Sequence, residues 1–326
     1  MDSGQRFGPG SRVLVAGGAG FVPSHVVDRL IERGATVVAV DNFITGAKEN
    51  LSHLDGNPRF TLVEFDLVNG LPDDVEAIEG RFDAILQLAS PASPTDFRRL
   101  ALEILRVNSI GTLHLLERAV TDRARFLLAS TSEAYGDPLV HPQPETYWGN
   151  VNPVGVRSVY DESKRFAEAA TMAYHRDRGV DVAIVRIFNT YGPRMGMDDG
   201  RAIPTFITQA LKGEPVTVLG TGEQTRSICY VDDLVRGILA LLDSTEAGPM
   251  NCGTEHEISM RELAEQIVRL TGSSSPVVYR PKAPDDPERR RPDLTLARSL
   301  LGYSPTVAPD EGLRRTIAHF RERLGL

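Results

Sequence analysis

The sequence predicts an α/β fold, a Rossmann-type doubly wound parallel sheet with a smaller α/β substrate-binding domain. In the first half of the chain, short and nearly uninterrupted apolar runs alternate with longer helical patterns, which is typical of a parallel sheet covered by helices on both faces. A glycine-rich turn at residues 17–20 follows the first run, as it does in sheets that bind dinucleotides. Beyond residue 189 the elements become shorter and richer in proline and glycine, which indicates a second lobe.

Six apolar runs are the expected strands of the sheet, and helical patterns separate them. The strands are expected at 12–16, 36–40, 60–65, 83–88, 125–130 and 180–188, and the helices include 21–33, 97–120 and 158–178. We therefore assign residues 1–188 to a Rossmann domain with a return segment at 227–252. Residues 189–226 and 253–326 are assigned to the substrate-binding domain.

Composition and charge argue against several classes of protein. The formal net charge of −8 argues against nucleic acid as the main partner. No stretch reaches the roughly 18 apolar residues of a membrane span, and the N-terminal residues lack an apolar signal core. Cys229 and Cys252 are too few for a disulfide framework, and the seven histidines show no metal-ligand spacing. We therefore expect a cytoplasmic protein with no metal ion and no membrane partner.

The glycine turn in RVLVAGGAGFVPSH (12–25) matches the dinucleotide-binding fingerprint at two of its three glycines. The first glycine, Gly17, permits the tight turn, and Gly20 lets the backbone approach the pyrophosphate. Pro23 stands where a third glycine is usual, but it falls in the first helical turn, where backbone N–H groups have no partner inside the helix. We expect a slightly displaced helix that still binds the cofactor.

Asp41 ends the second expected strand, where an acid accepts hydrogen bonds from the adenine ribose. An acid there favours NAD over NADP, whose 2′-phosphate it would repel, and a turn cap in DNFITG is the alternative role. Asp66, after the third strand, either contacts the adenine or caps a turn. The predicted NAD contacts are Gly17, Gly20, Phe21, Val22, Asp41, Asn42, Asp66, Leu67, Leu88, Ala89, Asn108, Tyr160 and Lys164.

A tyrosine and a lysine lie four residues apart in YDESK, which places Tyr160 and Lys164 on one face of a helix. Thr131, Ser132 and Glu133 follow the fifth expected strand, at the edge of the sheet where such folds bind ligands. A free tyrosine has a pKa of about 10, so a base working near pH 7 needs roughly 4 kcal/mol of help. One ammonium at about 4 Å supplies roughly that much at an effective dielectric constant near 20. We expect Lys164, together with an oxidised nicotinamide, to lower the pKa of Tyr160.

The order of several longer motifs produces a resemblance over nearly the whole chain. These motifs are LASPASP, ASTSEAYGDP, YWGNVNPVGVRSVYDESKR, RIFNTYGPRM, DGRAIPTF, QTRSICYVDDL and DDPERRRPDL. The sequence resembles the extended short-chain dehydrogenase/reductases and, among them, the UDP-glucuronic acid decarboxylases, also called UDP-xylose synthases. It departs from their pattern at Pro23, at Ala16 where threonine is common, at Gln87 where histidine is usual and at Ser163 where glycine is typical.

The resemblance and these residues together imply a reaction. Tyr160 would take the proton from the sugar 4-hydroxyl while the C4 hydride passes to NAD, and the resulting ketone lies β to the carboxylate, so that carbon dioxide can leave. Glu133 and Arg226, with Ser132 in support, are the candidates for steering decarboxylation and reprotonating C5, whereas a solvated acid and an inter-domain salt link are their alternative roles. Return of the hydride yields UDP-xylose, and early escape of the ketone yields UDP-4-keto-pentose and NADH. The catalytic candidates are therefore Tyr160, Lys164, Thr131, Ser132, Glu133 and Arg226.

Arginines are the expected ligands of the two phosphate groups in a UDP-sugar, because an acidic protein needs local guanidinium forks to hold them. Arg194, Arg201 and Arg290 are the candidates, and Arg226 is a further substrate contact. In the run 289–291 the resemblance favours Arg290 as the member that reaches phosphate.

Three further residues and two helices complete the expectations. Asn189, at the end of the sixth strand, is expected to anchor the nucleotide, and Ser93 in SPAS is expected to donate to the sugar carboxylate. The resemblance implies that Asn108 supports the active site from within a helix, with a packing role as the alternative. Similar enzymes commonly dimerise through two long helices, here 97–120 and 158–178, so the resemblance also implies a homodimer.

Three other functions compete with the decarboxylase. A sugar-nucleotide 4,6-dehydratase would need an Asp–Glu pair after Thr131, where this chain has Ser132. A 4-epimerase typically has small residues near that position, so Glu133 argues against it. A cofactor-sensing regulatory protein could dispense with the Tyr160–Lys164 pair. Turnover of UDP-glucuronate with loss of carbon dioxide separates the decarboxylase from all three.

Overall fold

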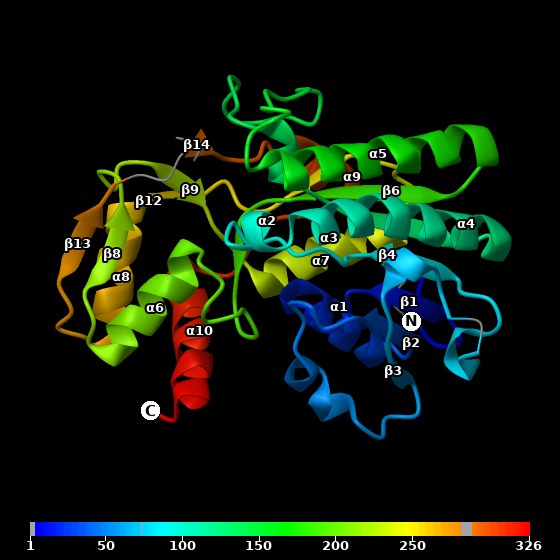
Figure 1. Cartoon of the computed structure of the whole chain (residues 1–326), viewed down its shortest axis with the longest axis horizontal. Coiled ribbons are helices and arrows are strands. Elements are labelled where there is room, and N and C mark those ends of the chain that lie inside the picture. The colour runs from blue at the N-terminus through cyan, green and yellow to red at the C-terminus, as the bar shows by residue number, and fades with distance from the viewer. Residues whose placement is uncertain (1–3, 73, 282–288) are drawn as a thin grey trace.

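A computed structural model of the chain describes residues 4–72, 74–281 and 289–326. At its centre lies a parallel seven-stranded sheet in the order β11–β6–β5–β4–β1–β2–β3 (Figure 1). The strands are β1 (Arg12–Ala16), β2 (Thr36–Asp41), β3 (Phe60–Glu64), β4 (Ala84–Gln87), β5 (Arg125–Thr131), β6 (Val182–Ile187) and β11 (Met250–Cys252). The predicted doubly wound parallel sheet is confirmed, and all six expected strands are present in it.

The near-continuous apolar runs form strands because both faces of the sheet are buried. Along β1, Val13 and Val15 pack into one apolar cluster, while Leu14 and Ala16 pack into another on the opposite face. Successive side chains of a strand point to opposite faces, so a strand covered on both sides needs apolar residues at every position. All seven residues of β5 are buried for the same reason.

Helices cover both faces of the sheet (Figure 1). On one face α1 (Phe21–Glu32) and α7 (Val231–Asp243) contact each other, and on the other α4 (Thr112–Asp122) contacts α5 (Ser158–Arg178). The expected helix at 158–178 is therefore present with the same bounds. It ends where Gly179 takes the left-handed conformation at φ 68°, which a glycine adopts at little cost.

The single helix expected at 97–120 is wrong, because this segment is divided into four parts. They are α2 (Asp96–Arg99), α3 (Ala101–Arg106), the π-helical turn η5 (Val107–Gly111) and α4. The Gln87 side chain at the end of β4 donates from Nε2 to the Val107 carbonyl at 3.3 Å and to Thr112 Oγ1 at 3.2 Å. A side chain from the sheet thus inserts at the point where the α-helical bonding pattern changes.

Short strands and helices of the second lobe lie beside the large sheet (Figure 1). The elements of this lobe are α6 (Ala202–Lys212), β8 (Val216–Leu219), β9 (Thr225–Ser227), β12 (Glu257–Ser259), α8 (Met260–Thr271), β13 (Val277–Arg280), β14 (Arg289–Arg290) and α10 (Pro309–Leu324). They form the small sheets β12–β9–β14 and β13–β8. The chain returns to the large sheet twice, since β11 pairs with β6 and α9 (Thr295–Leu301) contacts β11 and α7.

Short elements connect these parts of the fold. The two-residue strands β7 (Thr190–Tyr191) and β10 (Cys229–Tyr230) pair with each other, and the 3₁₀ turns are η1 (Lys48–Asn50), η2 (Ser52–Leu54), η3 (Leu67–Asn69), η4 (Glu76–Ile78) and η6 (Ser132–Tyr135). Cys229 and Cys252 are buried and unbonded to each other. Within the described residues, every helix falls short of the length and apolarity that would let it cross a membrane.

Candidate active site

A cleft of about 1290 Å³ lies at the carboxyl ends of the sheet strands and reaches into the second lobe. The predicted site residues that line it are Gly17, Gly20, Phe21, Val22, Asp41, Asn42, Asp66, Leu67, Leu88, Ala89, Ser93, Thr131, Ser132, Glu133, Tyr160, Lys164, Asn189, Arg194, Arg201, Arg226 and Arg290. The remaining predicted residue, Asn108, lies behind the wall, fully buried. Parallel strands present their carboxyl ends on one edge, so residues far apart in sequence meet there.

The glycine turn accepts no side chain at its first position. Gly17 has φ +74°, and a Cβ added to it would lie 2.6 Å from the Cα of Ala89. Gly20 precedes α1, and no side chain caps the helix there. The first backbone N–H groups of α1 are therefore left as donors next to a surface without side chains, which is what a pyrophosphate requires.

Pro23 is compatible with the helix that it enters. It is the third residue of α1 and is buried, and the Ser24 N–H donates to the Gly20 carbonyl at 3.1 Å. Helical hydrogen bonding thus starts directly after the proline, so the missing N–H of Pro23 breaks no bond inside the helix.

Asp41 ends β2 and serves both the turn and the cleft wall. Its Oδ2 accepts from the Ala19 N–H at 3.0 Å and its Oδ1 from the Phe43 N–H at 2.8 Å. Burial raises the pKa of this carboxyl, and the two backbone hydrogen bonds oppose that rise. Asp66 has the turn role, because its Oδ1 accepts from the Val68 N–H at 3.0 Å and caps η3.

Tyr160 and Lys164 both lie on α5 and are buried, with 7% and 3% of their surfaces exposed. Lys164 Nζ donates to the Ala129 carbonyl at 2.9 Å, so the end of β5 holds the ammonium. The ring of Phe97 stacks on that of Tyr160, with centroids 5.1 Å apart and an interplanar angle of 16°. The sequence did not single out Phe97, although it stands inside a segment expected to be helical.

The expected lowering of the Tyr160 pKa by Lys164 and an oxidised nicotinamide stays a prediction, and burial opposes it in the cofactor-free protein. Burial raises the pKa of Tyr160 to about 12, opposed by a hydrogen bond with Thr131. Lys164 Nζ lies 5.8 Å from the centroid of the tyrosine ring and bonds to the main chain. Burial lowers the pKa of Lys164 to about 7, and the charge of Glu168 opposes that fall. The i,i+4 spacing put the two residues on one face but did not fix which atoms meet.

Glu133 lies between two arginines on the cleft wall. Its Oε1 is 2.5 Å from Arg290 Nη1, and its Oε2 is 2.6 Å from Arg157 Nη2. Burial alone would raise the pKa of Glu133, but the charges and hydrogen bonds of Arg290 and Arg157 outweigh it and lower the pKa to about 2. The alternative of a solvated acid is thus excluded, because only 14% of the side chain is exposed.

The arginines expected at the phosphates have protein partners in this structure. Arg290 binds Glu133, and it pairs in register with Arg226 where β14 runs parallel to β9. Arg194, which has φ +67°, lies 2.7 Å from Asp28 of α1, measured from Nη1 to Oδ2. All of these arginines nevertheless border the cleft.

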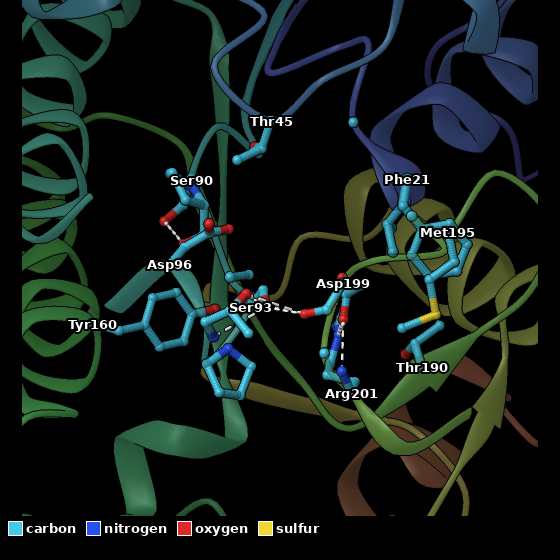
Figure 2. A pocket seen from close by; sticks show the side chains of 18 of the residues that line it. Phe21, Thr45, Ser90, Ser93, Asp96, Tyr160, Thr190, Met195, Asp199 and Arg201 are labelled. Atoms are coloured by element: carbon cyan, nitrogen blue, oxygen red, sulfur yellow. Dashed lines mark hydrogen bonds and ion pairs between the residues drawn. The ribbon is translucent and has the colours of Figure 1, made fainter. Parts of the chain in front are cut away.

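Asp199 contacts both Ser93 and Arg201 in the lining of the cleft (Figure 2). The guanidinium of Arg201 binds the Asp199 carboxylate, and the Ser93 hydroxyl donates to the Asp199 carbonyl. Asn189 uses its backbone carbonyl to accept from the Cys229 N–H at 2.8 Å. The sequence named Arg201 and Ser93 but not Asp199, which joins them.

Asn108 lies in the π-helical turn and connects three parts of the site. Its Nδ2 is 2.9 Å from Ser90 Oγ, 3.1 Å from the Ile104 carbonyl and 3.1 Å from Ser163 Oγ. Ser163 in turn donates to the Tyr160 carbonyl at 3.0 Å. Asn108 therefore links the loop after β4 to the helix that carries Tyr160, as a support behind the cleft.

Two charged residues that the sequence did not single out, Glu168 behind the cleft and Arg157 on its wall, hold groups of the site. Glu168 lies one helical turn after Lys164 and accepts from Ser130 Oγ. Its carboxylate also binds Arg186, with Oε2 2.7 Å from Nη2. The i,i+4 spacing of Lys164 and Glu168 places both residues on one face of the helix, and this spacing could have identified Glu168 from the sequence. Arg157, which binds Glu133, stands three residues before Tyr160 within YWGNVNPVGVRSVYDESKR.

Comparison with known proteins adds to this geometry. Residues 13–253 match the model of the NAD dependent epimerase/dehydratase family. The chain is 50% identical over 315 residues to UDP-glucuronic acid decarboxylase 2 of Arabidopsis thaliana. The matched region covers 97% of this chain and 69% of that protein. Among solved structures it resembles UDP-glucose 4-epimerase from Thermotoga maritima with UDP-glucose, with 32% identity, a TM-score of 0.87 and coverage of 96% and 99%. It also resembles UDP-glucuronic acid 4-epimerase from Bacillus cereus in complex with UDP-glucuronic acid and NAD, with 28% identity, a TM-score of 0.86 and the same coverage.

Proposed function

Because this chain belongs to the NAD dependent epimerase/dehydratase family, and within it to the UDP-glucuronic acid decarboxylases, we propose that it decarboxylates UDP-glucuronic acid with bound NAD. The reaction passes through a 4-keto intermediate and forms UDP-xylose, with UDP-4-keto-pentose as the product when the ketone leaves early. One observation carries the proposal. The Tyr160–Lys164 pair and the Glu133 carboxylate clamped by Arg290 and Arg157 border the same cleft.

The residues around the glycine turn fit NAD. Gly17 leaves room where a Cβ would collide with Ala89, the uncapped N-terminus of α1 offers N–H donors, and Asp41 stands at the end of β2. These features suit a pyrophosphate and a ribose with a free 2′-hydroxyl. When bound, NAD supplies a hydride acceptor for the sugar C4.

Tyr160 is proposed as the base that takes the 4-hydroxyl proton, with Thr131 sharing its hydrogen bond. Since burial raises the pKa of Tyr160 to about 12, the phenolate needs positive charge nearby. Lys164 is the cation on the same helix face, held by the Ala129 carbonyl. Once the ketone has formed, the protonated phenol donates to its oxygen and stabilises the enolate that remains after carbon dioxide leaves.

Glu133 is proposed to position arginines rather than to carry the C5 proton. A carboxyl group whose pKa is lowered to about 2 by two guanidinium groups is ionised at neutral pH, and it is a poor proton donor there. It holds Arg290 and Arg157 at the cleft wall, where they attract an acidic sugar. Arg226, beside Arg290, and Ser132, buried next to Glu133, are the proposed polar contacts of the reacting sugar.

We also propose a homodimer that forms through α3, η5 and α5. Leu102 is 59% exposed and Phe166 44% exposed, and Leu105 and Ile110 are exposed on the same group of elements. Since α3 and α5 contact each other, these side chains provide apolar surface on adjoining helices. We further propose that the chain is divided into an NAD-binding domain and a UDP-sugar-binding domain. We also propose a cytoplasmic location, which suits the two free thiols of Cys229 and Cys252.

The function is tested by incubating the purified protein with UDP-glucuronate and NAD and identifying the nucleotide-sugar products by mass spectrometry. A UDP-pentose and carbon dioxide support the proposal, and the Tyr160→Phe variant serves as the matched control, which should form neither. A product of unchanged mass that separates from UDP-glucuronate on chromatography would indicate a 4-epimerase. Unconverted substrate would refute the decarboxylase.

A further inference from the structure

A contact between the two lobes crosses the cleft, and Asp199 is its centre. Ser93 Oγ, from the loop after β4, donates to the Asp199 carbonyl (Figure 2). Thr95 Oγ1, from the same loop, donates to the same carbonyl at 3.3 Å, and the two hydroxyl oxygens are 2.8 Å apart. Asp199 belongs to the loop before α6. One carbonyl of the second lobe thus accepts hydrogen bonds from both hydroxyl groups of the loop that was expected to bind the sugar.

The side chain of Asp199 is engaged as fully as its carbonyl. Its carboxylate binds Arg201 in a two-pronged arrangement, with Oδ1 on Nε and Oδ2 2.6 Å from Nη2, and Oδ1 also accepts from the Arg201 N–H at 3.3 Å. Paired N–H groups on one edge of a guanidinium match a carboxylate or a phosphate. Arg201 therefore already binds a carboxylate of the protein at the guanidinium edge that would otherwise bind the anion of a ligand.

Two anions cannot occupy the same edge of one guanidinium. A ligand that binds this edge of Arg201 must displace the Asp199 carboxylate, and the hydrogen bonds of Ser93 and Thr95 to the Asp199 carbonyl break as well if the main chain moves with the side chain. Arg201 acts close to the reaction, since its charge is among those that lower the pKa of Tyr160. Displacement of the carboxylate would thus free a guanidinium edge on the wall of the active site, and a movement of the main chain would free two hydroxyl groups with it.

We propose that Asp199 is an internal competitor for the anion of the nucleotide sugar and that it holds Arg201, Ser93 and Thr95 together until that anion displaces it. The inference rests on the proposed function, because it assumes that a nucleotide sugar enters this cleft. The displacing group is a diphosphate or a sugar carboxylate, which share the same fork-binding chemistry. Asp199 is accordingly a specificity-determining residue, since a ligand without such an anion leaves the contact closed.

The test measures affinity in a Tyr160→Phe background saturated with NAD, so that the substrate is not consumed. Calorimetric titrations with UDP, UDP-glucose and UDP-glucuronate compare Asp199→Asn with Asp198→Asn, the exposed neighbour in the same loop. Both substitutions remove one negative charge, but only the first removes the group that binds Arg201. We expect Asp199→Asn to bind about tenfold more tightly, which equals about 1.4 kcal/mol, and Asp198→Asn to change the affinity by less than about twofold.

The three ligands distinguish the source of the anion. A gain shared by UDP, UDP-glucose and UDP-glucuronate assigns the diphosphate, and a gain confined to UDP-glucuronate assigns the sugar carboxylate. Unchanged or weaker binding of all three ligands overturns the proposal, because Asp199 would then merely orient Arg201. Asp199→Ala, checked by urea unfolding, replaces the asparagine variant if that protein fails to fold. Failure of the background protein to bind UDP would overturn the proposed function itself.

Discussion

Replacing Lys164 with methionine is expected to make the fold more stable while it removes activity. Burial lowers the pKa of Lys164 from 10.5 to about 7, because the folded protein disfavours the ammonium form. A pKa lowered by about 3.5 at 1.36 kcal/mol per unit means that the charged lysine costs the folded state about 5 kcal/mol below pH 7. This cost falls as the pH rises toward 10.5, to about 2 kcal/mol at pH 9, because the unfolded chain then also loses the proton.

Methionine removes this cost and loses one hydrogen bond, which offsets the gain by about 1 kcal/mol. We therefore expect a net stabilisation of about 3–4 kcal/mol near pH 6 and about 1 kcal/mol near pH 9. Urea unfolding of the cofactor-free protein at both pH values measures it, with Lys212→Met as the control on an exposed lysine at the end of α6. A Lys164→Met protein that is less stable than wild type at pH 6, or a difference that stays constant with pH, would refute the reasoning.

Three other perturbations follow from the same contacts. Gly17→Ala should weaken NAD binding about 100-fold or more in a fluorescence titration and lower the melting temperature, because it puts a Cβ into a position with φ +74° and against neighbouring backbone. Glu168→Gln removes the charge that raises the pKa of Lys164, so the alkaline limb of the pH–rate profile should move to lower pH; an unmoved limb would show that Glu168 does not act on Lys164. Glu133→Gln should lower the free energy of unfolding by about 3 kcal/mol at pH 7, because the pKa of the Glu133 carboxyl is lowered from 4.5 to about 2 in the folded protein. The ionised carboxylate stabilises the fold at pH values above 4.5, and this stabilisation is lost as the pH falls toward 2. Acid unfolding measured by circular dichroism checks this, and equal acid sensitivity of the two proteins would contradict it.

The sheet could be predicted because its sequence signal is local. Val13 and Leu14 enter opposite apolar clusters, so a strand buried on both faces has to be apolar throughout, and that pattern is visible in a few residues. The break in the helix at 97–120 could not be predicted in this way. It depends on the Gln87 side chain reaching Val107 and Thr112 from a strand about twenty residues away, and no periodicity within the helix records that contact.

The site shows the same division between residue identity and pairing. Motifs placed Tyr160, Glu133 and Arg290 at the cleft, and the structure puts them there. They did not show that Arg290 would bind Glu133, because the sequence lists the charged groups without saying which acid each arginine meets. Likewise, helical spacing put Lys164 beside Tyr160, whereas the Ala129 carbonyl on a neighbouring strand decides where the ammonium points.

We propose that Tyr160 and its neighbours, with NAD as the acceptor and donor of the hydride, oxidise C4, release carbon dioxide and reduce C4 again within one site. The most direct test is turnover of UDP-glucuronate that carries deuterium at C4, with both carbon dioxide and the position of the label in the product measured. We predict carbon dioxide and UDP-xylose that keeps the deuterium at C4. A product that still carries the carboxylate, or a UDP-xylose whose C4 carries hydrogen from the solvent, would contradict it.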